Sequence, residues 1–161
     1  IEHIGSKGTM TQKDIDNIKS TVTTVKNDVD AVQGSAACIE YGSSGTEVTL
    51  STTAAKVTNT NITETDTYNA ASDSLTIKTA GRYMVVANAT FQGTGNAHFS
   101  ILLNGSEVQT ASSYVVGVGT TSFSVIVSSG GGGVLTFTES CDSRQTIQSN
   151  GVEKISIQKL A

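Results

Sequence analysis

Long apolar runs, clusters of basic residues and a framework of cysteines are all missing from this sequence of 161 residues. The longest apolar stretch falls far short of about 18 residues, which excludes a membrane-spanning helix. No run of lysine or arginine occurs and the formal net charge is −4, so the chain lacks the cluster of positive charge that binds nucleic acid. Two cysteines make neither a disulfide framework nor a zinc site. We therefore expect no membrane insertion, no nucleic-acid partner, no bound metal and no cofactor.

Proline and tryptophan are absent, aromatic residues make up 5% of the chain and charged residues 15%. The chain is instead rich in serine, threonine and asparagine, and it contains 16 glycines. This composition is typical of β-rich extracellular or virion-type proteins rather than of cytosolic helical enzymes. A hydrophobic content of 37% allows one β domain with a lean core and a short appendage.

Near the N-terminus, apolar residues alternate at spacings of three and four, which is a heptad pattern with every a and d position filled. β-branched residues at both positions disfavour two strands and favour three or four. The pattern predicts a parallel coiled-coil stalk over residues 11–34 that joins several copies of the chain. The alternative is one amphipathic helix packed on its own domain, which would usually show a wider apolar stripe. The stalk positions are Ile15, Ile18, Val22, Val25, Val29 and Val32.

Both ends of this helix have recognisable signals. Thr11 and Asp14 have the spacing of a capping box, with aspartate in place of the usual glutamate. Gly34 suits the left-handed position that ends a helix. Residues 1–10 contain two glycines and are expected to form a disordered leader. Asp14 at a g position and Lys19 at the following e position would favour a parallel arrangement of copies.

From residue 35 onward the hydrophobic period changes to two, and short candidate strands alternate with turns rich in Gly, Asn and Ser. Residues 82–91 and 97–103 each place their apolar side chains on one face, as does 121–127. About ten short strands in such a length predict a β-sandwich or barrel, most simply a jelly roll over residues 35–161. The candidate strands are 37–41, 46–50, 55–58, 75–79, 82–91, 97–104, 107–111, 120–127, 133–139, 144–149 and 152–159.

Three segments carry a resemblance to a known family. Thr79–Tyr83 (TAGRY) precedes a long apolar strand, Ile101–Ser106 (ILLNGS) forms a strand and a tight turn, and Ile155–Leu160 (ISIQKL) closes the chain. In this order and spacing they resemble the bacterial and phage members of the complement globular-head and TNF-like superfamily of trimeric jelly rolls. The resemblance covers roughly residues 36–161 and implies a homotrimer. Ser128–Gly133 replaces a Gly-Asp turn that is common in the family, so no metal site is transferred from it.

The resemblance also implies an orientation for the turns. In such heads both chain ends lie at the base, so Ser149–Gly151, Ser128–Gly133 and Asn104–Ser106 are expected at the far, apical end. Cys38 and the turn after Cys141 are then expected near the base. The two cysteines could form a disulfide there or remain two free thiols.

Phage members of the family are modules of tail fibres, head fibres or baseplates, and some contact glycans on the host surface. The resemblance therefore implies a homotrimeric attachment module on a virion surface, linked to other virion proteins through its N-terminal stalk. The apical loops would bind host carbohydrate through amide and hydroxyl groups, with one aromatic side chain able to stack on a sugar ring. The candidate ligand-binding residues are Asn104, Ser106, Tyr114, Ser149 and Asn150.

Competing interpretations stay open at this point. A purely structural trimerisation or decoration domain is favoured by the low aromatic content, while a secreted signalling ligand or a polysaccharide depolymerase lacks supporting motifs. We identify no catalytic triad and expect no enzyme, since neither cysteine lies in a recognisable motif. His98 lies on the strand face opposite the core residues and is expected to be a surface or interface residue. Two acidic pairs, Glu64 with Asp66 and Glu139 with Asp142, could bind calcium or could be solvated loop carboxylates.

Overall fold

The computed structural model describes residues 10–35, 37–43 and 45–161, without the side chains of residues 30–35. The chain divides into two compact units, Ile1–Ser35 and Ala36–Ala161, and each is described here by itself. The expected leader over residues 1–10 lies outside the described residues, apart from Met10. No helix in the described ranges is long and apolar enough to cross a membrane.

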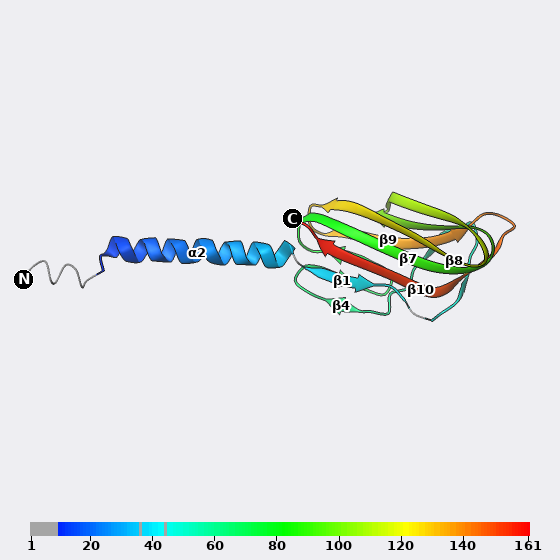
Figure 1. Ribbon diagram of the computed structural model, residues 1–161, viewed down its shortest axis with the longest axis horizontal. Helices are drawn as coiled ribbons and strands as arrows, with labels where there is room; N and C mark the ends of the chain where they lie inside the picture. The colour runs from blue at the N-terminus through cyan, green and yellow to red at the C-terminus, as the bar shows by residue number, and fades with distance from the viewer. Residues whose placement is uncertain (1–9, 36, 44) are drawn as a thin grey trace, which may run out of the picture. The chain divides into compact units, whose positions relative to one another are not determined.

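The first unit contains a single described helix, α2 (Gln12–Ser35), which begins at the predicted capping box (Figure 1). The backbone N–H of Asp14 donates to Thr11 Oγ1 at 3.2 Å, and the backbone N–H of Thr11 donates to Asp14 Oδ2 at 3.2 Å. The two residues thus satisfy each other's backbone donors, as the sequence predicts. The helix ends at Ser35, one residue after the predicted Gly34.

The apolar stripe of α2 faces solvent in the single chain. Ile18, Val22, Val25 and Val29 are each about half exposed or more, between 49 and 61%. Ile15 is half-buried, and the side chain of Val32 lies outside the description. The helix itself is therefore as predicted, whereas its association into a coiled coil stays a prediction.

The described residues of the second unit form antiparallel β-structure, with no helix between the strands. Two short strands, β4 and β5, were not predicted, because each has only two or three residues and little alternation. The ten strands are β1 (Cys38–Tyr41), β2 (Val48–Thr49), β3 (Ala55–Lys56), β4 (Thr63–Glu64), β5 (Tyr68–Ala70), β6 (Leu75–Ile77), β7 (Gly81–Leu103), β8 (Ser106–Ser129), β9 (Gly133–Cys141) and β10 (Thr146–Lys159).

The long hairpin of β7 and β8 joins the two halves of this sheet. β8 pairs with β7 along its whole length, while the other edge of β7 pairs first with β10 and then with β9. The first half thus contains β1, β2, β10 and the starting part of β7, and the second contains β3 to β6, β9 and the later part of β7. The halves fold onto each other, as the contact of the Tyr41 and Phe137 rings at 5.3 Å between centroids shows (Figure 1).

The core fills the space between the halves and has the faces that strand alternation predicts. Tyr83, Val85, Ala87, Ala89 and Phe91 of β7 are all buried completely. After the bend, alternate residues of β7 are again buried, so the same strand supplies core residues to both halves. These later residues are Ala97, Phe99 and Ile101.

Three pairs of predicted strands are in fact continuous strands. β7 runs through residues 92–96, β8 through 112–119, and β10 through a bulge between Ser149 and Glu153. Glycines make the bend in β7 possible: Gly93 and Gly95 have φ angles of 120° and 139°, which side-chain-bearing residues rarely adopt. A Cβ on Gly93 would stand 2.1 Å from the carbonyl oxygen of Thr146.

Because β10 is one continuous strand, the turns that precede it in the chain lie at the opposite end from the one predicted. We call the end of the β unit that carries Ala161 the terminal end, and the opposite end, with the β7 bend and the β9–β10 loop, the distal end (Figure 1). Gly81, which pairs with Ser129, lies at the terminal end, where the Arg82 N–H donates to the Ala161 carbonyl at 3.0 Å. The prediction that Ser128–Gly133 is apical is therefore wrong.

The Asn104–Ser106 turn and the turn after Cys141 are reversed in the same way, whereas Ser149 pairs with Phe91 close to the β7 bend and lies toward the distal end. The Asn104 N–H donates to the Val134 carbonyl at 2.8 Å, so the Asn104–Ser106 turn also lies at the terminal end. Cys141 pairs with Ala97 next to the bend and is distal, whereas Cys38 pairs with Gln158 near the end of the chain. Both cysteines are free, and their positions at opposite ends exclude the disulfide that the sequence left open.

Candidate functional site

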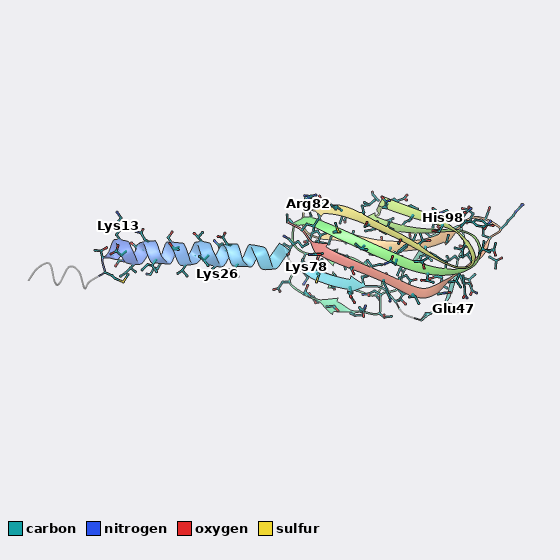
Figure 2. All side chains as sticks on the ribbon, viewed as in Figure 1. Lys13, Lys26, Glu47, Lys78, Arg82 and His98 are labelled. Carbon is teal, nitrogen blue, oxygen red and sulfur yellow. The ribbon has the colours of Figure 1, made fainter. Side chains whose placement is uncertain are left out.

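The structure brings five side chains together near the distal end of the β unit. Asn96 and His98 project from β7, and Tyr114 and Ser112 lie directly opposite them on β8. Asp142, in the loop between β9 and β10, reaches the same surface. We call these five residues the distal cluster; Figure 2 shows His98 toward the distal end and Arg82 at the terminal end.

Hydrogen bonds connect four members of the cluster. His98 Nε2 lies 2.7 Å from Asp142 Oδ1, and His98 Nδ1 lies 2.6 Å from Ser112 Oγ. Asn96 Nδ2 donates to Asp142 Oδ2 at 2.9 Å, so both carboxylate oxygens are occupied. These bonds favour the charged form of Asp142, and the bond from His98 has the largest effect in holding the carboxyl pKa below its usual value.

A backbone contact fixes the position of the Asp142 loop. The Asn96 N–H donates to Gln145 Oε1 at 3.2 Å, and the Gln145 N–H donates to the Asp142 carbonyl at 3.3 Å. Gly95 has no side chain, and this leaves room for Gln145, whose Oε1 would overlap a Cβ at that position. The bend in β7 therefore seats the loop and orients the carboxylate of Asp142.

An exposed apolar strip continues from the cluster along β8. Tyr114 is 66% exposed, Val116 70% and Val118 68%. Tyr114 lies opposite Asn96 in the strand register, and the Asn96 amide and the His98 imidazole share the Asp142 carboxylate, so the same region offers both donors and acceptors. An aromatic surface next to planar hydrogen-bonding groups suits a ligand with an apolar face and a hydroxyl-rich edge, such as a sugar ring.

The five predicted ligand-binding residues do not form one site. Tyr114 alone belongs to the distal cluster, while Asn104 and Ser106 lie at the terminal end. Ser149 is fully buried, and the side-chain oxygen of Asn150 is buried without a hydrogen-bond partner. The prediction of one apical location is wrong for Asn104 and Ser106, because the predicted turn at Ser149–Gly151 is a bulge within continuous β10.

Sequence reasoning missed four members of the distal cluster. His98 was identified as a surface or interface residue without partners, and Asn96, Ser112 and Asp142 were not connected with it. The alternation in β7 places His98 opposite the core side, but only the strand register and the loop position join these residues. The predicted pairing of Glu139 with Asp142 fails, since Glu139 is buried and Asp142 is exposed.

No group of three or more His, Cys, Asp or Glu side chains in the described part of the chain is arranged to hold a metal ion. Glu64, a member of the other predicted calcium pair, instead forms an ion pair with Lys78 at 2.7 Å. That contact lowers the pKa of the exposed Glu64 carboxyl through a hydrogen bond and the charge of Lys78.

The outer face of the first half of the sheet is a second exposed region. Met84 lies opposite Ile126, and these two residues and Val86 are 38 to 44% exposed. A depression of about 490 Å³ extends from this face toward β1 and β10. Glu40 and Lys154 supply charged groups to its lining, and Asn88 supplies an amide.

Comparisons with known proteins identify the fold. No protein-family model and no curated protein matches the sequence. Among solved structures, murine APRIL at pH 8.5 superposes with a TM-score of 0.61 at 9% identity, covering 76% of this chain and 98% of that chain. Eiger TNF from S. frugiperda superposes with a TM-score of 0.57 at 8% identity, covering 77% of this chain and 92% of that chain. The β unit therefore has a TNF-like jelly-roll fold.

Proposed function

We propose that the protein is a homotrimeric attachment module of a bacteriophage virion, in a tail or head fibre, which binds a cell-surface glycan. The observation that carries this proposal is the distal cluster, where an exposed tyrosine stands beside an ordered polar network. The serine- and threonine-rich composition and the resemblance to phage heads support the assignment to a virion.

The exposed stripe of α2 supports assembly into a trimer. Four β-branched residues at heptad positions are each about half exposed or more in the isolated chain. Burying them against two further copies would remove this apolar surface from water, and their shape favours more than two strands. We propose that this stalk also links the module to other virion proteins.

The β unit offers its own surface for assembly. Met84, Val86 and Ile126 form an apolar group on an otherwise polar sheet face rich in serine. Such a group on the outside of a sheet is a candidate for contact with a neighbouring copy. A short coiled coil is marginal on its own, so contacts between β units would supply much of the stability of the trimer.

Glycan binding by one cluster would be weak, because the site is open and has one aromatic residue. Three copies held in one trimer raise the effective concentration of the remaining sites once the first has bound. The proposed module would therefore bind a surface that carries many copies of a glycan better than it binds a single soluble oligosaccharide.

The test combines mass measurement with glycan binding. Light scattering should give the mass of three chains, and a glycan array probed with the full chain should identify a bound glycan. Tyr114→Ala should remove binding, whereas Ser106→Ala, at the terminal end, should leave it unchanged. A mass of one or two chains contradicts the trimer, and equal binding by both variants contradicts the location of the site.

The alternative is a structural trimerisation or decoration domain without a ligand. The aromatic content of 5% favours it, since sugar sites commonly use several aromatic surfaces. Deleting the β unit from the protein in the virion distinguishes the two functions. Adsorption to the host should be lost if the protein is an attachment module and kept if it is a decoration domain.

A further inference from the structure

The geometry points to an acyl-transfer site in which Ser112 is the nucleophile, His98 the general base and Asp142 the group that orients the base. This activity goes beyond glycan attachment and does not depend on it. It rests on the two short contacts of His98, at 2.6 Å to Ser112 Oγ and 2.7 Å to Asp142 Oδ1. A hydroxyl within reach of a base that is itself held by a third group is the arrangement that activates a serine.

The hydrogen-bond partners of His98 determine which atoms of the three side chains carry protons. An ionised carboxylate only accepts hydrogen bonds, so His98 Nε2 must carry the hydrogen that is shared with Asp142. In a neutral imidazole the other ring nitrogen then has a free lone pair. Ser112 therefore donates its hydroxyl hydrogen to His98 Nδ1, and its oxygen is prepared to attack an electrophile.

A further hydrogen bond holds the carboxylate in place. Asp142 Oδ2 accepts from Asn96 Nδ2 at 2.9 Å, which prevents the carboxylate from rotating away from His98. The side chain of His98 is 27% exposed, and that of Asp142 is 50% exposed. The array is thus ordered by hydrogen bonds and open to a reactant from solvent.

The strand that carries Ser112 also supplies hydrogen-bond donors. In the described sheet β8 pairs with β7 alone, so its other edge is free. Along an edge strand, backbone N–H groups of alternate residues point away from the ladder. A free N–H accordingly lies within one residue of Ser112, where it is available to a developing oxyanion.

The reaction would proceed in two balanced steps. Ser112 Oγ attacks the ester carbonyl carbon, its proton passes to His98, and the alcohol leaves after taking that proton as the C–O bond breaks. Water then attacks the acyl-serine, giving its proton to His98, and the carboxylic acid departs as Ser112 regains its hydrogen. The only co-reactant is water, and no electron transfer is involved.

The exposed setting defines the substrate class. Ser112 stands on an open strand surface, which offers no enclosed space for a long acyl chain. The predicted substrates are therefore esters of small acyl groups, of which acetate is the simplest.

The experiment measures serine reactivity directly in the full chain. A fluorophosphonate probe should label the wild-type protein, and peptide mass spectrometry should locate the label on Ser112. Hydrolysis of p-nitrophenyl acetate should fall by about 100-fold in Ser112→Ala and in His98→Gln. Asp142→Asn should reduce the rate at least about tenfold, because an amide no longer enforces the required tautomer.

Ser122→Ala is the matched control, since Ser122 is an exposed serine on the same strand opposite Asn88 rather than a histidine. It should keep both the label and the rate. Circular dichroism checks that each variant is folded. Absence of labelling on Ser112, or an ester hydrolysis rate in Ser112→Ala equal to that of the wild type, overturns the assignment.

Discussion

The carboxyl groups of Glu139 and Glu153 face each other inside the β unit, one from each half of the folded sheet. Glu139 is 4% exposed and Glu153 5% exposed, and Ser149 Oγ donates to Glu153 Oε1 at 2.8 Å. Glu139 Oε2 has no partner of its own. Burial, followed by the hydrogen bond and charge of Glu153, raises the pKa of Glu139 to about 9. Glu139 therefore keeps its proton at neutral pH.

This pair predicts that the protein loses stability as the pH rises. The pKa of Glu139 is higher in the folded state than in the unfolded chain, where it has the ordinary value near 4.5. The full stabilisation is present below the unfolded pKa and is lost as pH rises toward about 9. In this window the free energy of unfolding should fall steadily as the pH rises, because the unfolded chain releases the Glu139 proton and the folded protein keeps it. Urea unfolding at a series of pH values and a fixed protein concentration measures this free energy.

The variant Glu139→Gln identifies the group responsible. Its amide has nearly the same shape as the protonated carboxyl group but no titrating proton, so the pH dependence over this range should flatten. Glu107→Gln, at an exposed position on β8, should keep the wild-type slope. Equal slopes in wild type and Glu139→Gln would show that the pair does not hold the proton.

Three glycines of the β unit should respond differently to alanine, according to their φ angle and the space around them. Gly93→Ala should lower the free energy of unfolding by at least about 2 kcal/mol, since a Cβ would stand 2.1 Å from the Thr146 carbonyl oxygen at a φ of +120°. Gly117→Ala meets no atom within 4 Å but has a φ of +80°, so it should cost about 1 to 2 kcal/mol. Gly130→Ala lacks both problems and should be neutral or slightly stabilising. Thermal unfolding that gives a different order would contradict the assigned backbone conformations.

Asn59 predicts a large effect for a polar residue far from the distal cluster. Its Oδ1 accepts from the N–H groups of Gly42 and Asn61 at 3.0 Å each, and its Nδ2 donates to the Ala71 carbonyl at 2.9 Å. The side chain is 2% exposed, so Asn59→Ala leaves several buried groups unsatisfied and should cost roughly 2 to 4 kcal/mol. Denaturant unfolding provides the measurement. Asn69→Ala, at an exposed position, should change stability by less than about 0.5 kcal/mol.

The cysteines should differ in reactivity. Cys38 is exposed and should react quickly with a thiol reagent, whereas Cys141 is 3% exposed and burial raises the pKa of its thiol. One equivalent should therefore react in the folded protein and a second only after denaturation. Cys38→Ser should remove the fast phase, and a sample without any reactive thiol would contradict the placement of the two residues.

Local sequence patterns predict the helix and the buried strand faces well, because both depend on residues close together in the sequence. The heptad spacing and the capping residues predict α2 to within one residue at its end, because both depend on neighbours three or four positions apart. The alternation predicts the buried faces of β7, since successive side chains of a strand point to opposite sides. The TNF-like fold was likewise indicated by short motifs in their order.

Turn signals were less reliable, because glycine and asparagine also occur at bends and bulges. Asn150 and Gly151 suggested a reversal between two strands, yet they lie in a bulge of continuous β10. One false reversal inverts the direction of every preceding strand, so Asn104, Ser106 and the Ser128–Gly133 turn were assigned to the wrong end.

The sequence by itself determined the helix, the strand faces and the fold class, because these follow from periodicity and from backbone preferences of nearby residues. Only the tertiary structure decided which end of the β unit carries each turn and which polar residues meet. Ser112, His98 and Asp142 come from two strands and a loop, and their contacts arise from strand register and the bend at Gly93 and Gly95. Glu139 and Glu153 meet only because the two halves of the sheet fold onto each other.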